Sequence, residues 1–328
     1  MKEIIRYLQR TNDIQSIIQG LEGGMKEQLV AGVANSARSL FVAAIQDATK
    51  KKGIIITHQL LHAQQLYDDL MEYSDEQNVF LYPVNELIAS EMAISSPELR
   101  ANRIKALTEW LHKDEGLLIA PVAALKRILP PKHYWNQYKL HFEELGTIDV
   151  DNYTKSLFEM GYERVDMVTA PAEFSIRGGI IDIYPVTEQN PIRIELFDDE
   201  VDSIRYFDAD SQRSLDKVTN ITVGPATELL LKKEDMLRAK ERLEKELAKV
   251  LKKMKASEHR EALLQSMNEE MEKLDNGELF QGIYKYSGLF YEQPYSLLDY
   301  MEDDHVLLFD EIGRVQEAAD YLDKEEAE

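Results

Sequence analysis

The first third of the chain alternates between short apolar runs and longer stretches with helical spacing. The runs at 53–57 (GIIIT) and 116–120 (GLLIA) are apolar throughout, which is typical of strands buried on both faces of a parallel sheet. Further strands are predicted at 28–31 and 79–82, and helices at 3–22, 40–45, 60–71 and 97–110. This alternation predicts a doubly wound α/β domain with right-handed crossovers.

The pattern changes after the proline pair at 130–131. Residues 134–142 predict a strand and residues 150–161 a helix that ends at a glycine, and three short strands follow between 174 and 214. We expect a small, separate α+β domain here. In its strand at 192–197, Ile192, Ile194 and Leu196 alternate with Arg193, Glu195 and Phe197, so one face is apolar and the other is mixed.

Two long amphipathic helices are predicted at 236–254 and 258–274. A helical hairpin lying on the sheet is favoured over a coiled coil, because no heptad pattern continues through residue 257. A last apolar strand begins at 305 and ends in Asp310-Glu311. Acids at such a strand end hold Mg²⁺ in nucleotide-hydrolysing folds, whereas the default expectation is a pair of solvated carboxylates.

Composition narrows the class of protein. The 328 residues carry a net charge of −22, which argues against non-specific binding to DNA or RNA, and residues 126–207 alone hold nine basic and fifteen acidic residues. There is no cysteine, which excludes thiolate chemistry and suits a reducing cytosol. With no membrane-length apolar run and no signal peptide, we expect a cytoplasmic location. The chain ends within a charged helical pattern, so we expect it to be a piece of a longer protein.

A strand, a loop and a helix around 28–45 give the context of a phosphate-binding loop. Gly32 and Ser39 fit the form GxxxxGK[ST], but Ala37 stands at the second glycine and Arg38 at the lysine. The second glycine lets backbone N–H groups close on phosphates, and the lysine neutralises their charge. Two interpretations remain, a nucleotide-binding site and a turn that serves only packing. The departures from the motif at Ala37 and Arg38 favour the turn.

His58 and His62 have a spacing typical of two metal ligands on a helix. A zinc-protease helix would also need a glutamate beside the first histidine, where this chain has Gln59, and no third ligand is evident. A solvated helix surface is therefore the favoured interpretation, and we expect no metal site.

The segment 172–185 (AEFSIRGGIIDIYP), continued by 193–200 (RIELFDDE) and 207–213 (FDADSQR), carries a resemblance to a known family. The chain resembles the N-terminal part of the bacterial transcription-repair coupling factors (Mfd), and in particular their module similar to the excision-repair helicase UvrB. The resemblance covers nearly all of the chain.

The resemblance implies a degenerate P-loop (RecA/helicase-like) parallel-sheet domain that is split in sequence. Its parts are about 1–125 and 208–328, the second with the helical hairpin, and the inserted α+β domain, 126–207, is the one that binds UvrA in both families. UvrB inserts a DNA-clamping hairpin in its first domain, whereas here only residues 85–96 lie between Val84 and Pro97, which is too short for that device.

By motif match, the residues carried over for UvrA binding are Arg177, Arg193 and Phe197. The opposing interpretation is that Phe197 is a core residue and both arginines pair with local acids. Glu195, between Arg193 and Phe197, is expected to orient the arginine or to meet a basic group of the partner.

The resemblance implies a non-catalytic adaptor without catalytic, metal or cofactor residues of its own, in nucleotide excision repair of damaged DNA. It would recruit UvrA to lesions where RNA polymerase has stalled. Polymerase binding, ATP and Mg²⁺ would belong to domains beyond residue 328, one of which would cover the UvrA-binding face. The alternative is an active ATPase or helicase domain in which Arg38 replaces the lysine and Asp310-Glu311 hold the metal.

Overall fold

A computed structural model describes all residues except 1, 35, 86–96, 255–257, 281 and 328. The backbone divides into two compact units. Unit 1 comprises the described parts of 1–91, 105–127 and 300–328, and unit 2 those of 92–104 and 128–299. Within the described residues, no helix combines the length and the apolar character needed to cross a membrane.

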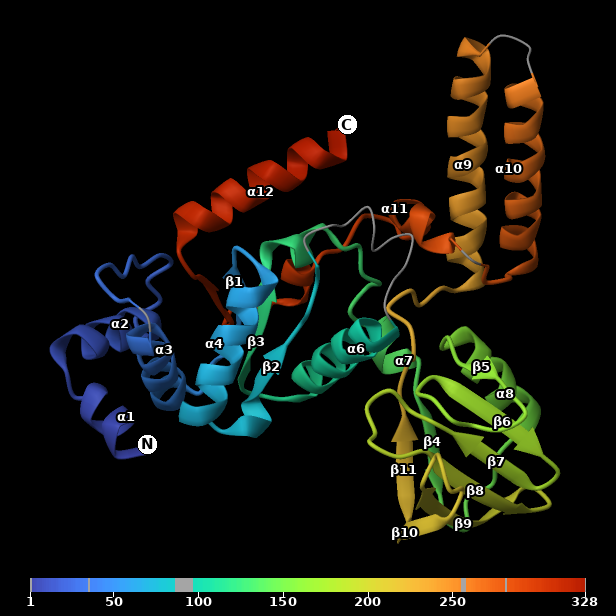
Figure 1. Cartoon of the computed structure of the whole chain (residues 1–328), viewed down its shortest axis with the longest axis horizontal. Helices are drawn as coiled ribbons and strands as arrows, with labels where there is room; N and C mark the ends of the chain where they lie inside the picture. Colours follow the sequence, from blue (N-terminus) through green and yellow to red (C-terminus); the bar gives the residue numbers. More distant parts are fainter. Residues whose placement is uncertain (1, 35, 86–96, 255–257, 281, 328) are drawn as a thin grey trace. The chain divides into compact units, whose positions relative to one another are not determined.

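Unit 1 is built on a four-stranded parallel sheet in the order β12-β1-β3-β2 (Figure 1). The predicted parallel sheet is confirmed. Every residue of its two central strands is buried, which explains why these runs are apolar throughout. The bounds of the strands are β1 Lys52–Thr57, β2 Val79–Leu81, β3 Gly116–Pro121 and β12 Val306–Phe309.

The strand predicted at 28–31 is wrong. These residues form a loop in which Leu29 is 84% exposed, so the short apolar run has no sheet to join. The fourth strand is β12 instead, whose residues 306–309 pair with Gly53–Ile56 of β1. The sheet is therefore completed by a strand from the far end of the chain.

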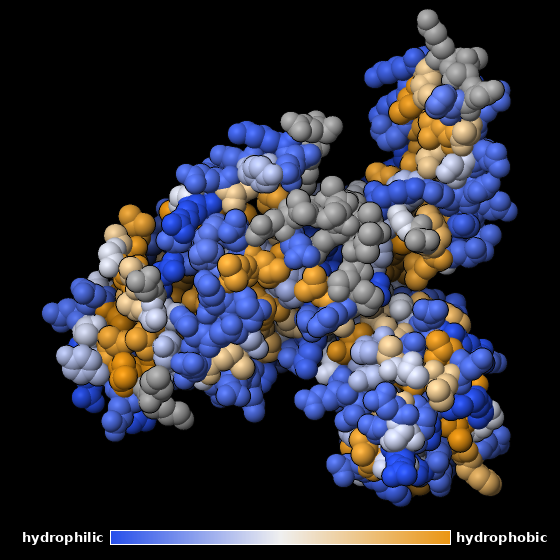
Figure 2. Space-filling model, viewed as in Figure 1, coloured by the Kyte–Doolittle hydropathy of each residue, from blue (hydrophilic) through white to orange (hydrophobic). Residues whose placement is uncertain are grey.

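Helices cover this sheet and form a common core with it. The predicted helix at 3–22 is two helices, and α4 packs against β1, β2 and β3. Apolar side chains also gather on the visible surface around α1, α2 and α3 (Figure 2). The bounds are α1 Lys2–Leu8, α2 Asn12–Glu22, α3 Ser36–Thr49, α4 Leu60–Tyr73, η1 Glu76–Asn78, α6 Pro97–His112, η2 Val122–Lys126 and α12 Ile312–Ala327.

Unit 2 contains a six-stranded sheet in the order β10-β9-β8-β7-β6-β5, in which only β5 and β6 run parallel. The three strands predicted from the alternation are β7, β8 and β9. The predicted strand at 134–142 is only partly right, because its first half is the short helix α7, Tyr134–Gln137. The bounds are β4 Leu140–Glu143, β5 Glu163–Arg164, β6 Glu173–Arg177, β7 Ile180–Ile183, β8 Ile192–Phe197, β9 Glu200–Phe207, β10 Ser214–Val218 and β11 Asn220–Val223.

The strands β10 and β11 follow residue 207, yet they pair with strands of the inserted region. β10 pairs with β9, and β11 pairs with β4 in a separate two-stranded sheet. The helical hairpin also belongs to unit 2, and its two helices α9 and α10 pack against each other. The remaining helical bounds of unit 2 are α8 Val150–Glu159, α9 Lys233–Lys253, α10 Glu258–Asn276, η3 Ile283–Tyr286, α11 Ser287–Phe290 and η4 Leu297–Tyr300.

Candidate functional site

A row of polar residues crosses one face of the six-stranded sheet. Ser175 of β6 lies opposite Asp182 of β7, Asp182 opposite Arg193 of β8, and Arg193 opposite Arg205 of β9. Their neighbours along each strand, such as Ile194, point to the other face and are buried there. The alternation seen in the sequence therefore produces one apolar and one charged face, as predicted.

Asp182 is the centre of this row. Its side chain is only 1% exposed, and its carboxylate accepts hydrogen bonds from Arg193 Nε (2.7 Å), Arg193 Nη2 (2.8 Å) and Arg177 Nη2 (2.9 Å). A buried carboxylate is stable only when it is paired and hydrogen-bonded, and two guanidinium groups meet that need. The two arginines that were predicted to bind a partner thus both pair with one local acid, and this part of the opposing interpretation is confirmed.

The two arginines differ in exposure. Arg193 is 17% exposed and lies over the Phe207 ring, with its guanidinium carbon 4.5 Å from the ring centroid. Its hydrogen bonds to Asp182 raise the pKa of Arg193 above its ordinary value. Arg177 is 50% exposed and makes one bond to the same acid. Arg193 is therefore held within the face, whereas Arg177 has donors left for a partner.

Phe197 is 80% exposed, so the interpretation that it is a core residue is wrong. It pairs with Glu200 across a two-residue turn in which Asp198 adopts a φ of 60°. The turn of the β6–β7 hairpin lies beside the end of β8, because the Leu196 N–H donates to the Gly179 carbonyl at 2.7 Å. Arg177 and Phe197 thus end up at the same end of the sheet.

The Gly178-Gly179 turn is needed for this close approach. Gly178 has a φ of 60°, and a Cβ at Gly179 would lie 2.8 Å from the Leu196 carbonyl oxygen. A side chain at Gly179 would push the two hairpins apart, whereas one at Gly178 would meet open space but strain the left-handed backbone. Gly179 therefore permits the close approach of the two turns.

Glu195 does not orient Arg193. Its carboxylate accepts hydrogen bonds from Ser203 Oγ at 2.9 Å and from Arg205, both on the neighbouring strand β9. This cross-strand pairing engages Glu195 with β9, while Arg193 donates to Asp182 and, at 3.4 Å, to Gln212 Oε1.

A shallow groove of about 480 Å³ adjoins Arg177 along β5 and β6. Arg164 and Asp166 line it together with Arg177, and Ser175 Oγ donates to the Asp166 carbonyl at 3.2 Å within it. The face thus offers a hollow beside a charged side chain. In Figure 2 this part of unit 2 is mostly polar, with separate apolar patches.

Leu145 is an exposed residue that the sequence analysis missed. It is 77% exposed, has a φ of 66°, and its N–H donates to the Val201 carbonyl at 2.8 Å. Thr147 bridges to Glu200, the residue opposite Phe197, so this segment runs beside the β8–β9 turn. No local pattern distinguishes Leu145 from a buried leucine, because its neighbours come from β9 in space.

Of the residues predicted to form a degenerate phosphate loop, Gly32 lies before α3, and Ala37, Arg38 and Ser39 lie in its first turn. Arg38 Nη1 is 3.2 Å from both carboxylate oxygens of Asp310 and 3.5 Å from Glu311 Oε2. Ser39 is 2% exposed and donates to Asp69 Oδ2 at 2.6 Å, while Gly32 and Ala37 are exposed. The two residues expected at the lysine and serine positions therefore bond to protein acids.

Asp310 is not a solvated acid. Its side chain is 12% exposed, and burial raises its pKa above the ordinary range while the Arg38 guanidinium opposes that shift. The expectation of solvated carboxylates at the end of this strand is wrong for this residue. Its main partner is the arginine that stands at the lysine position of the loop.

His58 is 8% exposed, so the expected solvated surface is wrong for this residue. Burial lowers the pKa of the His58 imidazole. The structure also supplies the third ligand-type residue that the sequence lacked, because Glu311 lies beside His58 and His62. Its position depends on the pairing of β12 with β1, which local spacing cannot reveal.

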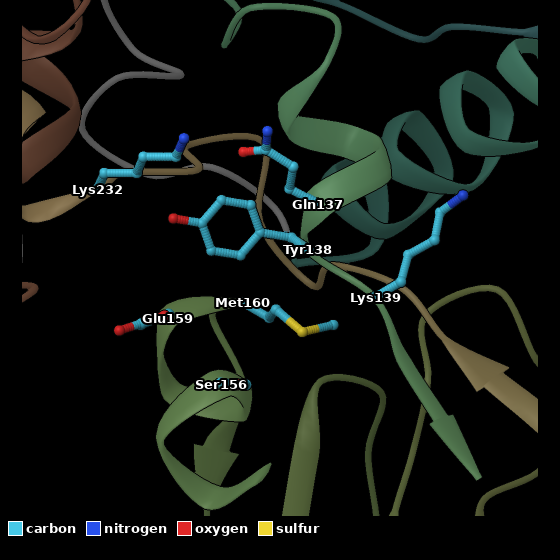
Figure 3. Close-up of a pocket in the computed structure, with 7 residues that line it drawn as sticks. All are labelled: Gln137, Tyr138, Lys139, Ser156, Glu159, Met160 and Lys232. Carbon is cyan, nitrogen blue, oxygen red and sulfur yellow. The ribbon is translucent and has the colours of Figure 1, made fainter. Parts of the chain in front are cut away.

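A second pocket, of about 290 Å³, lies in unit 2 around Tyr138. Figure 3 shows the Tyr138 ring between Lys232 on one side and Glu159 and Met160 on the other. The Tyr138 hydroxyl donates to the Leu231 carbonyl at 2.9 Å, and the Lys232 ammonium lies 4.5 Å from the centroid of the Tyr134 ring. These two contacts hold residues 231–232 in place.

Comparison with known proteins identifies the region that carries the charged face. Residues 140–229 match the family described as UvrB interaction domain. The whole chain is 47% identical over 328 residues to a transcription-repair-coupling factor of Bacillus subtilis, covering 28% of that protein. Proteins of the same name from Staphylococcus haemolyticus (33% over 309 residues; 92% of this chain and 26% of the relative) and Staphylococcus aureus MRSA252 (32% over 306; 91% and 25%) are also similar. The chain spans about a quarter of the length of these relatives.

Proposed function

We propose that this chain, which is homologous to the N-terminal region of transcription-repair-coupling factor, is a non-catalytic adaptor that binds UvrA. In the full-length protein it would recruit UvrA to DNA lesions where RNA polymerase has stalled. Polymerase binding and ATP-driven translocation would belong to the rest of that protein, which this chain does not include. The site of action would be the cytoplasm, where transcription and repair meet in bacteria.

The observation that carries the proposal is the exposure of Phe197 at the same end of the sheet as Arg177, which shares a buried acid with Arg193. Phe197 is 80% exposed at a tight turn, and an aromatic side chain has only two rotatable bonds to immobilise on binding. Aromatic and arginine residues are frequent among those that dominate interface energies. Asp182 holds Arg193 and Arg177 in place before a partner arrives. All of these residues lie within the segment that matches the UvrB interaction domain.

The proposed roles differ among the three residues. Phe197 is the anchor that enters a pocket of UvrA, and Arg177 offers its free donors to a carboxylate of UvrA. Arg193 positions Arg177 indirectly, because both arginines share the Asp182 carboxylate. Leu145, on the segment beside the same turn, extends the apolar part of the surface.

The absence of catalysis is part of the proposal. Arg38 and Ser39 would have to release Asp310 and Asp69 before they could contact a nucleotide, and Ala37 has a side chain where the loop needs a glycine. The rival function is an active ATPase. A titration of the chain with ATP and Mg²⁺ separates the two, because micromolar affinity would favour the ATPase and no binding the adaptor.

We also propose the predicted division of the chain into parts 1–125, 126–207 and 208–328, with β12 returning to the first sheet. The pairing of β10 with β9 attaches residues just past 207 to the sheet of the middle part. The residues of the face that carries Phe197 lie within 126–207.

The proposal is tested by measuring the affinity of the purified 328-residue chain for UvrA with isothermal titration calorimetry. Phe197→Ala should weaken binding by roughly 30-fold, the effect of losing a hot spot of about 2 kcal/mol. Val250→Ala is the matched control, because Val250 is an exposed apolar residue on α9 outside the sheet. No binding by the wild-type chain, or the same affinity for Phe197→Ala, Arg177→Ala and Arg193→Ala as for wild type, would refute the assignment.

A further inference from the structure

Two histidines meet at the carboxyl end of β1 in unit 1. The strand ends at Thr57, His58 follows it, and α4 begins at Leu60, so that His62 lies in the first turn of this helix. The two imidazole rings are 4.0 Å apart between centroids and inclined by 47°. The change from strand to helix thus places both rings at the carboxyl end of β1.

Glu311 reaches the same edge from the other end of the chain. β12 runs parallel to β1 with Phe309 opposite Ile56, and the Asp310 N–H donates to the Ile56 carbonyl at 2.9 Å. The carboxyl ends of neighbouring parallel strands lie together, so Glu311 arrives beside His58. One ring nitrogen of each histidine and one carboxylate oxygen of Glu311 all lie within 4.8 Å of one another.

Both histidines have a buried nitrogen without a protein partner. Among the described residues, Nδ1 of His58 and Nδ1 of His62 are enclosed and make no hydrogen bond. A buried polar atom without a partner costs free energy, and such atoms in native proteins usually have a function. Glu311 has a φ of 56° and turns the chain from β12 into α12.

We propose that His58, His62 and Glu311 bind a divalent transition-metal ion of the zinc class. Two imidazoles and one carboxylate form a common donor set for zinc, and water would take the remaining position. Ligands in a tetrahedral zinc site lie about 3.4 Å apart, so only small rotations of these side chains are required. The chain contains no cysteine, and the site is therefore limited to nitrogen and oxygen donors.

Two arginines compete with the metal for Glu311. Arg314 Nη1 lies 3.2 Å and Arg38 Nη1 3.5 Å from Glu311 Oε2. Arg314 is 58% exposed, and exposed ion pairs are weak, so its contact is easily given up. Arg38 keeps its shorter contacts with Asp310 when Glu311 turns away. Glu311 can therefore change partners without leaving an arginine unpaired in a buried place.

The ion would join two distant parts of the sequence. His58 and His62 belong to the β1–α4 segment, whereas Glu311 lies between β12 and α12. A metal bound by all three would hold the last strand of the sheet against β1. The site would thus stabilise the closure of a domain whose strands come from both ends of the chain.

The test is a titration of the chelator-treated 328-residue chain with Zn²⁺ in competition with a chromophoric chelator. We expect one ion per chain in this site, tighter binding of Zn²⁺ than of Mg²⁺, and a higher melting temperature with Zn²⁺. Substitutions His62→Ala and Glu311→Gln should each weaken Zn²⁺ binding by roughly tenfold or more. His259→Ala, an exposed histidine on α10, is the matched control and should bind like wild type.

Arg314→Ala gives the opposite expectation. It removes a positive charge that competes for Glu311, so Zn²⁺ binding should tighten by roughly threefold. Co²⁺ absorption bands in wild type that are lost in His62→Ala would show imidazole coordination directly. This variant affects a half-buried side chain and keeps the test informative if His58→Ala does not fold.

Three results would overturn the proposal. One is equal affinity for Zn²⁺ in wild type, His62→Ala and Glu311→Gln. Another is binding of Mg²⁺ as tight as that of Zn²⁺, which would indicate a carboxylate site. A third is loss of binding on His305→Ala alone, because Glu302, Asp304 and His305 form a second group of ligand-type atoms within 4.8 Å.

Discussion

The chain contains two arginine–carboxylate clusters that use the same chemistry to different ends. In unit 2, Arg177 and Arg193 share the buried Asp182, and the exposed Phe197 lies beyond them at the turn. In unit 1, Arg38 bonds Asp310 and approaches Glu311. The first cluster fixes a surface that faces outward. The second joins the start of α3 to the end of β12, and its groups pair with one another.

This difference shows that whether an arginine can bind a partner depends on how many of its N–H donors the fold has not already used. Arg38 is 27% and Arg177 50% exposed, and Arg177 lines a groove at the end of the sheet that carries the 80% exposed Phe197. A partner-binding surface needs donors and apolar area that the fold has not used. Four substitutions test this comparison, from the largest expected effect to the smallest.

Asp182→Ala should have the largest effect on stability. It leaves two guanidinium groups without their buried acid, and the loss of one partner of a buried pair should lower the free energy of unfolding by about 3 kcal/mol. Urea unfolding followed by Trp135 fluorescence, in a Trp110→Phe background, reports on unit 2. Asp202→Ala, an exposed acid on β9, is the control. A change below about 1 kcal/mol would show that Asp182 does not organise this face.

Arg193→Ala should lower the free energy of unfolding by about 2 kcal/mol, because two charge-assisted hydrogen bonds and the contact with Phe207 are lost. The same fluorescence measurement applies. Arg193→Lys keeps the charge but not the planar fork, and should recover only part of the loss. Full recovery with lysine would mean that charge alone matters at this position.

Arg38→Ala should lower the stability of unit 1 by about 1 kcal/mol, since Asp310 is partly buried and loses its partner. Trp110 fluorescence in a Trp135→Phe background gives the measurement. Arg314→Ala is the control, because Arg314 pairs with Glu311 on the exposed side. If Arg38→Ala were as stable as Arg314→Ala, the Arg38–Asp310 pair would not contribute to the stability of unit 1.

Arg177→Ala should have the smallest effect on stability, about 0.5 kcal/mol or less, because its side chain is half exposed. Its affinity for UvrA should nevertheless fall by roughly fivefold. Calorimetry with UvrA and urea unfolding of the same preparation measure both quantities. A large loss of stability with unchanged affinity would reverse the roles assigned to Arg177 and Arg193.

Periodicity predicted the parts of the fold whose residues are neighbours in the sequence. The runs that became β1 and β3 are apolar because both faces of these strands are covered, and such burial is visible locally. The mistaken strand at 28–31 has a similar apolar character but no neighbour to pair with. The strand that completes the sheet, β12, comes from residues 306–309, and only the tertiary fold shows that it lies beside β1.

The candidate sites show the same limit. The alternation in β8 predicts Arg193 and Phe197 on one face, but it could not show that Arg193 is mostly covered and Phe197 is not. Exposure at the end of a hairpin depends on the turn geometry at Asp198 and on the neighbouring Gly178-Gly179 turn. Likewise, the spacing of His58 and His62 could not reveal Glu311, which parallel pairing brings from the far end of the chain.

The most direct test of the account is amide hydrogen exchange of the whole chain with and without saturating UvrA. The outward-facing surface predicts slower exchange in the β6–β7 and β8–β9 turns, at 177–180 and 196–201, and in 145–148 beside them. Exchange at the start of α3, around Arg38, should be unchanged. Protection around Arg38 without protection at 196–201 would contradict the central claim that UvrA binds the face carrying Phe197.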